Sequence, residues 1–312
     1  ARANLSLVGT ITMALATQSE LEDALDRIEN AGSRGPPMQT IRTFLRLVRE
    51  GKARLPAEVS KHGAYLLKRS PGILRPDERW LVHEQVTIAC LDSGDLGSAK
   101  KLIDEIDSRF PESLRVAILQ GMLLEAEKKW EQADEQYLKI LETNEAHQNA
   151  WKRRVAVARQ QGNDSKAMSI LKEYLDVFVI DGEAWEELAS LYISNQMLKQ
   201  AAFCYEEIIL LAPSDPYCHI KYADVLYSIG GASNMKTALA YYAMALDLTN
   251  GSNVHAMYGI QAIGHALGSV KGQNKLTEKE EELVKKASEK LLFLYKNKQP
   301  ELVNHLKCTL VP

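Results

Sequence analysis

Small and aromatic residues recur along the chain at one fixed interval. Ala99, Ala133, Ala167 and Ala201 form an evenly spaced series. Trp151 and Trp185 are separated by the same interval. Because self-similarity at a fixed period is typical of repeat proteins, the pattern predicts a stack of similar units and not one globular core.

Each unit is predicted to be a pair of antiparallel helices. In residues 182–215, Trp185 falls in the first helix and Ala201 in the second. Two helices approach closely only where a small side chain separates them, so Ala201 marks the contact and Trp185 fills the space beside it. Pro213 ends the second helix, since proline lacks an amide donor and clashes with the preceding turn. The period and the Trp, Ala and Pro positions match the tetratricopeptide repeat, which is about 34 residues long. Ala189 stands where that repeat has glycine.

The same register divides most of the chain into repeats. Units in strict register are predicted at 80–113, 114–147, 148–181 and 182–215. In a fifth unit, 216–252, the second helix is displaced by three residues, and a longer turn at 230–234 is expected to absorb the displacement.

The ends of the chain depart from the repeat signature. Residues 38–79 are predicted to form a divergent N-terminal helical cap, and residues 1–37 an extension of unassigned structure with one helix near 19–30. Residues 253–312 are predicted to hold a degenerate repeat and a C-terminal helical cap, whose helix starts at a capping box of Thr277 and Glu280. The predicted fold is all-α: a tetratricopeptide-repeat right-handed superhelix, or α-solenoid, with divergent capping helices at both ends.

Composition and charge exclude several classes of function. The 312 residues are 46% hydrophobic and 25% charged with a net charge of -3, and the short basic cluster 152–154 is isolated, so nucleic-acid binding is not expected. No apolar run reaches the roughly 20 residues that a membrane-spanning helix needs. Cys204, Cys218 and His219 have no further ligand at metal-site spacing, so no metal site is expected. Without a catalytic motif or a phosphate-binding glycine loop, we expect no enzyme activity and no cofactor.

A non-catalytic repeat protein acts through its surface. In tetratricopeptide proteins, positions 2, 5, 9, 12 and 13 of successive first helices face a groove. The candidate partner-binding residues at these positions are Leu81, Glu84, Ile88, Leu91, Arg115, Ile118, Met122, Lys152, Arg159, Glu186, Ile193, Tyr217, Ile220 and Tyr227. The series is apolar at both ends and charged in the middle, which suits an amphipathic helix laid along the groove. The alternative for Leu81, Ile88 and Ile118 is that they only complete the packing between repeats.

The groove lacks the residues of a co-chaperone clamp for the acidic tail of a heat-shock chaperone. That clamp needs Lys and Asn in one repeat, Asn in the next, and Lys and Arg in the third. Lys152 meets the first requirement, but Ala156 replaces the asparagine and Glu187 stands at the next position. Tyr217 and Lys221 occupy the last positions. One basic residue cannot hold two carboxylates, and Glu187 would repel them.

The repeats resemble one family in particular. The segment 184–231, which contains AAFCYEE at 201–207, is similar to subunit 2 of the endoplasmic reticulum membrane protein complex, as is the stretch 84–113. The likeness covers roughly residues 38–300. It implies a non-catalytic scaffold on the cytosolic face of the endoplasmic reticulum membrane, which supports insertion of tail-anchored and multi-pass membrane proteins.

The same resemblance implies the partners. They would be sister subunits, whose cytosolic segments the groove would hold: the cytosolic tail of subunit 5, cytosolic elements of subunit 3, and a soluble subunit of the 8/9 type. Membrane association would then come through these partners only. A soluble tetratricopeptide adaptor or co-chaperone is the alternative function.

Overall fold

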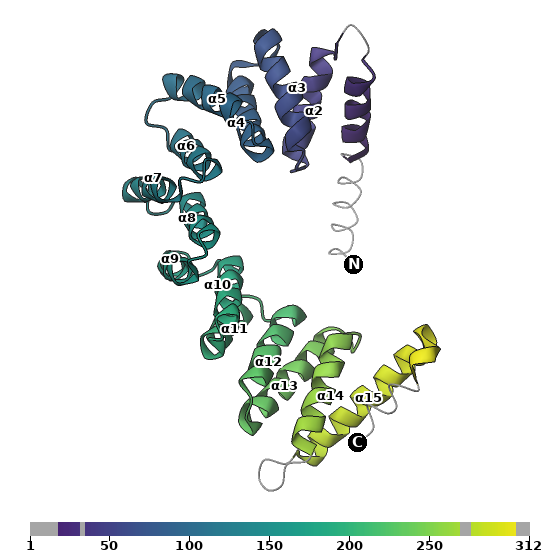
Figure 1. The fold of residues 1–312 in the computed structure, drawn as a ribbon. Helices are drawn as coiled ribbons and strands as arrows, with labels where there is room; N and C mark the ends of the chain where they lie inside the picture. Colours follow the sequence, from purple (N-terminus) through teal and green to yellow (C-terminus); the bar gives the residue numbers. More distant parts are fainter. Residues whose placement is uncertain (1–17, 32–34, 269–275, 304–312) are drawn as a thin grey trace. The chain divides into compact units, whose positions relative to one another are not determined.

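The computed structural model describes residues 18–31, 35–268 and 276–303, which form helices joined by turns (Figure 1). No strand occurs in these ranges. The chain divides into two compact units, Ala1–Gly162 and Asn163–Pro312. Residues 1–17 of the predicted extension and 304–312 of the predicted C-terminal cap lie outside the described residues.

The first unit is a series of antiparallel helix pairs. A helix over residues 18–29 precedes the numbered ones. The others are α2 (Met38–Glu50), α3 (Pro56–Arg69), α4 (Pro76–Ser93), α5 (Leu96–Arg109), α6 (Leu114–Ala126), α7 (Trp130–Thr143) and α8 (Gln148–Gln160), with a 3-10 turn η2 (Pro71–Ile73) after α3.

The second unit continues the same pattern. Its helices are α9 (Asp164–Val177), α10 (Gly182–Ser194), α11 (Leu198–Leu211), α12 (Pro216–Ile229), α13 (Ala232–Leu248), α14 (Val254–Gly268) and α15 (Glu278–Lys298), followed by a 3-10 turn η3 (Pro300–Leu302).

The helix starts reproduce the period of the alanine series. First helices begin at Leu114, Gln148, Gly182 and Pro216, and second helices at Leu96, Trp130, Asp164, Leu198 and Ala232. The fold is therefore the all-α tetratricopeptide-repeat architecture predicted from the sequence.

Two predicted boundaries are wrong. The limit between residues 79 and 80 falls inside α4, because Pro76 starts this helix at its first position, where a missing amide costs nothing. The longer turn predicted in the fifth repeat is not observed, since α13 begins in register at Ala232. Its packing positions are displaced by three residues as predicted, because the buried alanine is Ala238. Gly230 and Gly231, with φ of +78° and +84°, let the chain reverse direction in two residues. The extra residues instead lengthen α13 to 17 residues, against 14 in α11.

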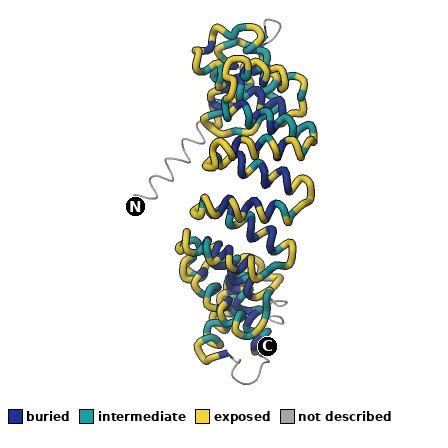
Figure 2. The backbone as a smooth tube through the Cα atoms, turned by 90° about the vertical axis from the view of Figure 1, so that its left-hand side faces the viewer, coloured by how far each residue is buried: buried dark blue, intermediate teal, exposed yellow. Residues whose placement is uncertain are grey.

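The small-residue series forms the closest helix contacts. The four predicted alanines and the corresponding alanine of α13 are fully buried, at 0% exposure: Ala99, Ala133, Ala167, Ala201 and Ala238. Figure 2 shows the buried positions on the sides of the helices that face one another, and the exposed positions on the outer sides and in the turns. Burial of one side of every helix is the main source of stability in such a stack.

The aromatic series has a second role, which the sequence pattern did not indicate. The indole Nε1 of Trp151 donates to the Glu145 carbonyl at 2.9 Å, and that of Trp185 to the Val179 carbonyl at 2.8 Å. In the next repeat, one period after Trp185, His219 occupies the same position, and its Nε2 lies 2.8 Å from the Pro213 carbonyl oxygen. In α8, α10 and α12, a ring at this position therefore ties the first helix to the turn before it.

Helix caps also agree with the sequence. Asp215 caps α12 by accepting a hydrogen bond from the Tyr217 amide at 3.0 Å, and Pro216 occupies the first helical position. The predicted capping box of Thr277 and Glu280 is present at the start of α15.

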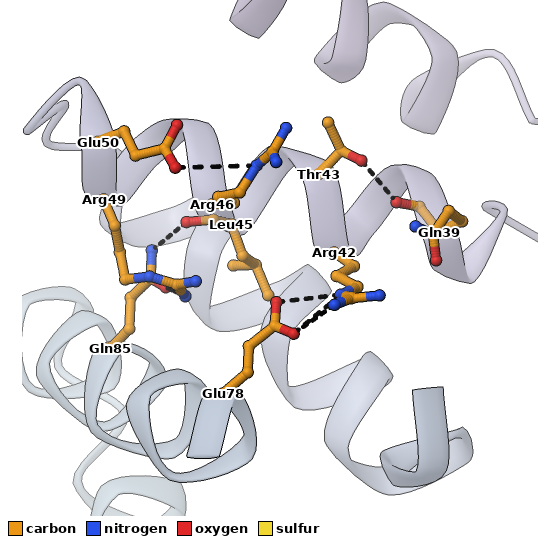
Figure 3. Close-up of polar contacts among 9 residues, drawn as sticks. All are labelled: Gln39, Arg42, Thr43, Leu45, Arg46, Arg49, Glu50, Glu78 and Gln85. Carbon is orange, nitrogen blue, oxygen red and sulfur yellow. Dashed lines mark hydrogen bonds and ion pairs between the residues drawn. The ribbon is translucent and has the colours of Figure 1, made fainter. Parts of the chain in front are cut away.

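A polar seam joins α2 to α4 in the first unit (Figure 3). Arg42 donates through Nη2 to Glu78 at 2.6 Å, and Arg49 donates to Gln85 at 2.7 Å. Gln85 in turn donates to the Leu45 carbonyl at 3.1 Å. The hydrogen bond from Arg42 holds the pKa of the Glu78 carboxyl below its ordinary value.

The first prediction concerns Gly121 in α6. A Cβ atom there would lie 2.4 Å from the ring of Tyr137, which is fully buried and cannot move aside. Gly121→Ala should therefore lower the free energy of unfolding by about 1–3 kcal/mol, although alanine is otherwise the better helix former. Gly182 at the start of α10 is the matched control, because nothing lies within 4 Å of its added Cβ. Urea unfolding that finds Gly121→Ala as stable as Gly182→Ala would contradict this packing.

The second prediction concerns the pH dependence of stability. Since the pKa of Glu78 is lowered in the folded state, its contribution is complete above the ordinary value of 4.5 and is lost as the pH falls through the lowered value. Glu78→Gln should cost stability near pH 7, and the difference from wild type should shrink below pH 4.5. Glu50→Gln is the control, because Glu50 faces Arg46 at 3.9 Å with both side chains exposed. A constant difference from pH 7 to pH 3, measured by urea unfolding, would contradict the assignment.

Candidate protein-docking surface

The predicted groove residues lie on one series of first helices. We define the first-helix face as the predicted positions on α4, α6 and α8 in the first unit and on α10 and α12 in the second. Its exposed members are Leu81, Ile88, Arg115, Lys152, Arg159, Glu186, Tyr217 and Tyr227. Among them Leu81 and Ile88, at 43% and 36% exposure, are aliphatic side chains on the solvent side of α4. Both residues therefore keep aliphatic surface open to a partner, besides any part that they have in the packing between repeats.

Three predicted residues are corrections. Leu91, Met122 and Ile220 are only 7–8% exposed. Their side chains complete the packing between helices, so a partner could not reach them. Ile118 is half-buried against the core of the first unit, while Glu84 and Ile193 are also half-buried.

A cavity of about 400 Å³ opens on the first-helix face of the first unit. Leu81 and Arg115 line it from α4 and α6, together with the aromatic side chains of Trp80 and Phe110. The Trp80 and Phe110 rings meet edge to face, with centroids 5.2 Å apart. Glu84 and Arg115 form an ion pair across it. The cavity thus offers an apolar floor beside one charged pair, which is the arrangement of many binding pockets.

Polar pairs also bridge successive first helices in the second unit. The Tyr217 hydroxyl donates to Glu186 Oε1 at 3.3 Å, and His255 Nε2 lies 2.9 Å from Asp224 Oδ1. The Lys221 ammonium lies 5.2 Å from the centre of the Tyr217 ring. Both pairs have the same sequence separation as the Glu84–Arg115 pair, so side chains of neighbouring repeats orient one another along the face.

The basic cluster at 152–154 does not form a basic surface. Arg154 is buried and pairs through Nε with Asp134 Oδ1 at 2.8 Å, while Arg153 pairs with Glu125 at 3.3 Å. Only Lys152 of the three is exposed. This cluster therefore stabilises the first unit internally, because buried arginine requires a charged partner.

The three cysteines in the described ranges are buried structural residues. Cys90, Cys204 and Cys218 are buried and free, and burial raises the pKa of their thiols to about 11, 12 and 11 respectively. At neutral pH such thiols are almost entirely protonated and so are poor nucleophiles. In the described ranges, no three His, Cys, Asp or Glu side chains come together in a way that could hold a metal ion.

No helix in the described part of the chain is long and apolar enough to cross a membrane.

Comparison with known proteins identifies the family. Residues 112–237 match the family described as EMC2 TPR-like repeat domain. ER membrane protein complex subunit 2-A of Xenopus laevis is 39% identical over 184 residues, which cover 59% of this chain and 62% of the relative. Subunit 2 of Dictyostelium discoideum is 35% identical over 211 residues, which cover 67% of this chain and 66% of the relative. The chain belongs to the family of ER membrane protein complex subunit 2.

The match within this subunit 2 family includes the repeats that carry Trp151 and Trp185, and it ends within α13. The chain spans less than two thirds of the length of the Xenopus relative. Among solved structures, a tetratricopeptide repeat protein from Parabacteroides merdae is 15% identical, with 88% of this chain and 98% of that chain covered and a TM-score of 0.42.

A second cavity of this subunit 2 family member was not predicted from the first-helix positions. A larger cavity, of about 750 Å³, lies in the second unit between α9, α10 and α11, away from the first-helix face. Its exposed aromatic residue is Phe203, which the sequence pattern marks as unusual. The corresponding positions of the preceding repeats carry Ser169, Glu135 and Lys101.

Proposed function

We propose that this chain acts as a non-catalytic scaffold subunit of the ER membrane protein complex. Family membership carries the proposal, because the relatives named above are subunits of that complex. The exposed aliphatic residues of the first-helix face support it, since Leu81 and Ile88 leave apolar surface open to a partner.

The scaffold would work by holding cytosolic segments of sister subunits on the first-helix face. The cavity beside Leu81 suits an aromatic or aliphatic anchor of such a segment, and the Glu84–Arg115 pair would orient polar groups next to it. The sister subunits we propose are subunit 5 through its cytosolic tail, subunit 3 through its cytosolic elements, and a soluble subunit of the 8/9 type. The chain would thereby support insertion of tail-anchored and multi-pass membrane proteins from the cytosolic face of the endoplasmic reticulum.

The soluble adaptor or co-chaperone is the competing function. The buried position of Arg154 adds to the sequence argument against a clamp for acidic tails, because it removes one of the few basic groups near Lys152 from the surface. A clamp needs several basic side chains that reach the same carboxylates.

Co-purification decides between the two functions. The protein would be isolated from detergent-solubilised membranes and, in parallel, from the soluble fraction. We expect multi-pass partners in stoichiometric amounts in the membrane fraction. Recovery in the soluble fraction alone, or with a heat-shock chaperone as the main partner, would contradict the scaffold and favour the adaptor.

The third prediction locates the docking surface. Leu81→Asp combined with Ile88→Asp should reduce recovery of sister subunits by more than about tenfold, because loss of a central apolar anchor costs about 2 kcal/mol or more. Both residues are exposed, so the thermal unfolding midpoint should change little. Leu138→Asp is the control, since Leu138 is 38% exposed on the second helix α7. Unchanged recovery in the double variant, or an equal loss in the control, would place the interface elsewhere.

A further inference from the structure

The second unit contains a groove on its second-helix side. We define the second-helix groove as the cavity of about 750 Å³ whose walls are α9 and α11 and whose floor is α10. The floor residues Trp185, Leu188 and Tyr192 are spaced i, i+3 and i+7, so they follow one side of α10 for two turns, or roughly 10 Å. Leu188 and Tyr192 are nearly covered, at 2% and 5% exposure, so the open apolar surface belongs to Trp185, Phe203 and Val179. Glu186 and Ile193, the first-helix face residues of α10, do not line this groove.

Charges in the second-helix groove are ordered from one end to the other. At the Tyr192 end, Lys172 of α9 lies with its ammonium 5.8 Å from the centre of the Tyr192 ring. Lys199 lies at this end too, because it belongs to the first turn of α11, which follows α10 after a short turn. This end of the groove is therefore basic.

The opposite end is acidic. The antiparallel course of α10 places Trp185 beside the end of α9, where Asp176 lines the groove. Glu207 lines it from the later part of α11. Between the two charged ends, Phe203 meets Trp185 with ring centroids 6.1 Å apart at an interplanar angle of 74°.

The apolar character of this groove is not required by the repeat. Phe203 is 53% exposed, and the corresponding positions of the preceding repeats carry the polar residues Ser169, Glu135 and Lys101. Val179, which also lines the groove, is 52% exposed, and its counterpart in the next repeat is Pro213. Aromatic residues exposed in a concave site are the usual anchors of a protein interface.

We propose that the second-helix groove binds an amphipathic helix of a partner protein, with acidic residues at one end of the bound segment and basic residues at the other. The open apolar surface of Trp185, Phe203 and Val179 suits apolar anchors on one side of a docked helix. Lys172 and Lys199 would pair with the acidic end, and Asp176 and Glu207 with the basic end. An anionic membrane surface is a poorer fit, because the acidic end would be repelled by it.

The proposal is independent of the function proposed above, because the two surfaces share no residue. The test uses the full chain and three helical peptides, each roughly four helical turns long, with the same leucine and phenylalanine anchors. One peptide has an acidic and a basic end, one has acidic residues at both ends, and one has basic residues at both ends. Fluorescence anisotropy should show that the wild-type chain binds the peptide with opposite ends tightest, by about tenfold.

The fourth prediction concerns variants in which the charges at one end of the second-helix groove are reversed. Lys172→Glu with Lys199→Glu makes both ends of the groove acidic, so the preferred peptide should become the basic one. Asp176→Lys with Glu207→Lys makes both ends basic, so the preferred peptide should become the acidic one. Failure of all three peptides to bind, or one order of affinities shared by all three proteins, would overturn the proposal.

A separate pair of variants tests the apolar residues of the second-helix groove. Phe203→Asp should abolish binding of every peptide, whereas Met244→Asp should leave binding unchanged, because Met244 is 50% exposed on α13 and does not line the groove. Thermal unfolding of both variants checks that the second unit is folded. Equal peptide affinities for a folded Phe203→Asp variant and for Met244→Asp would overturn the proposal.

Discussion

The whole architecture depends on the contact made by a fully buried alanine in the second helix of each repeat. With only a methyl group at this position, the two helix backbones approach closely, and larger side chains fill the space on either side. Because Ala99, Ala133, Ala167 and Ala201 are evenly spaced in the sequence, the same contact recurs in the same geometry along the chain. The clash that a Cβ at Gly121 would make with Tyr137 shows how little room these contacts leave.

Function can vary on this framework because the contact uses only one side of each helix. The remaining sides can carry residues that a partner requires, and exposed apolar residues among them stand out against the repeat pattern. Leu81 and Ile88 are such residues on α4, and Phe203 is another on α11. Such exposed residues can change without loss of the buried contacts that define the fold.

The sequence predicted the repeat register well because it depends on small and aromatic residues that have few alternatives. It predicted the start of α13 wrongly, since the sequence does not distinguish a long turn from two glycines that reverse the chain at once. It also misjudged Leu91, Met122 and Ile220, because position within a repeat does not determine how far the neighbouring repeat covers a side chain. The second-helix groove could not be predicted from the first-helix positions, because its exposed aromatic residue, Phe203, belongs to a second helix.

The first-helix face is proposed to hold cytosolic segments of membrane-spanning partners. The most direct test is a photo-reactive amino acid placed at Ile88 in cells, with Leu138 as the control position. We expect Ile88 to cross-link to the cytosolic part of a membrane-spanning subunit of the complex, and Leu138 not to cross-link to it. Cross-links from Ile88 to soluble chaperones alone, or a yield no greater than that from Leu138, would contradict it.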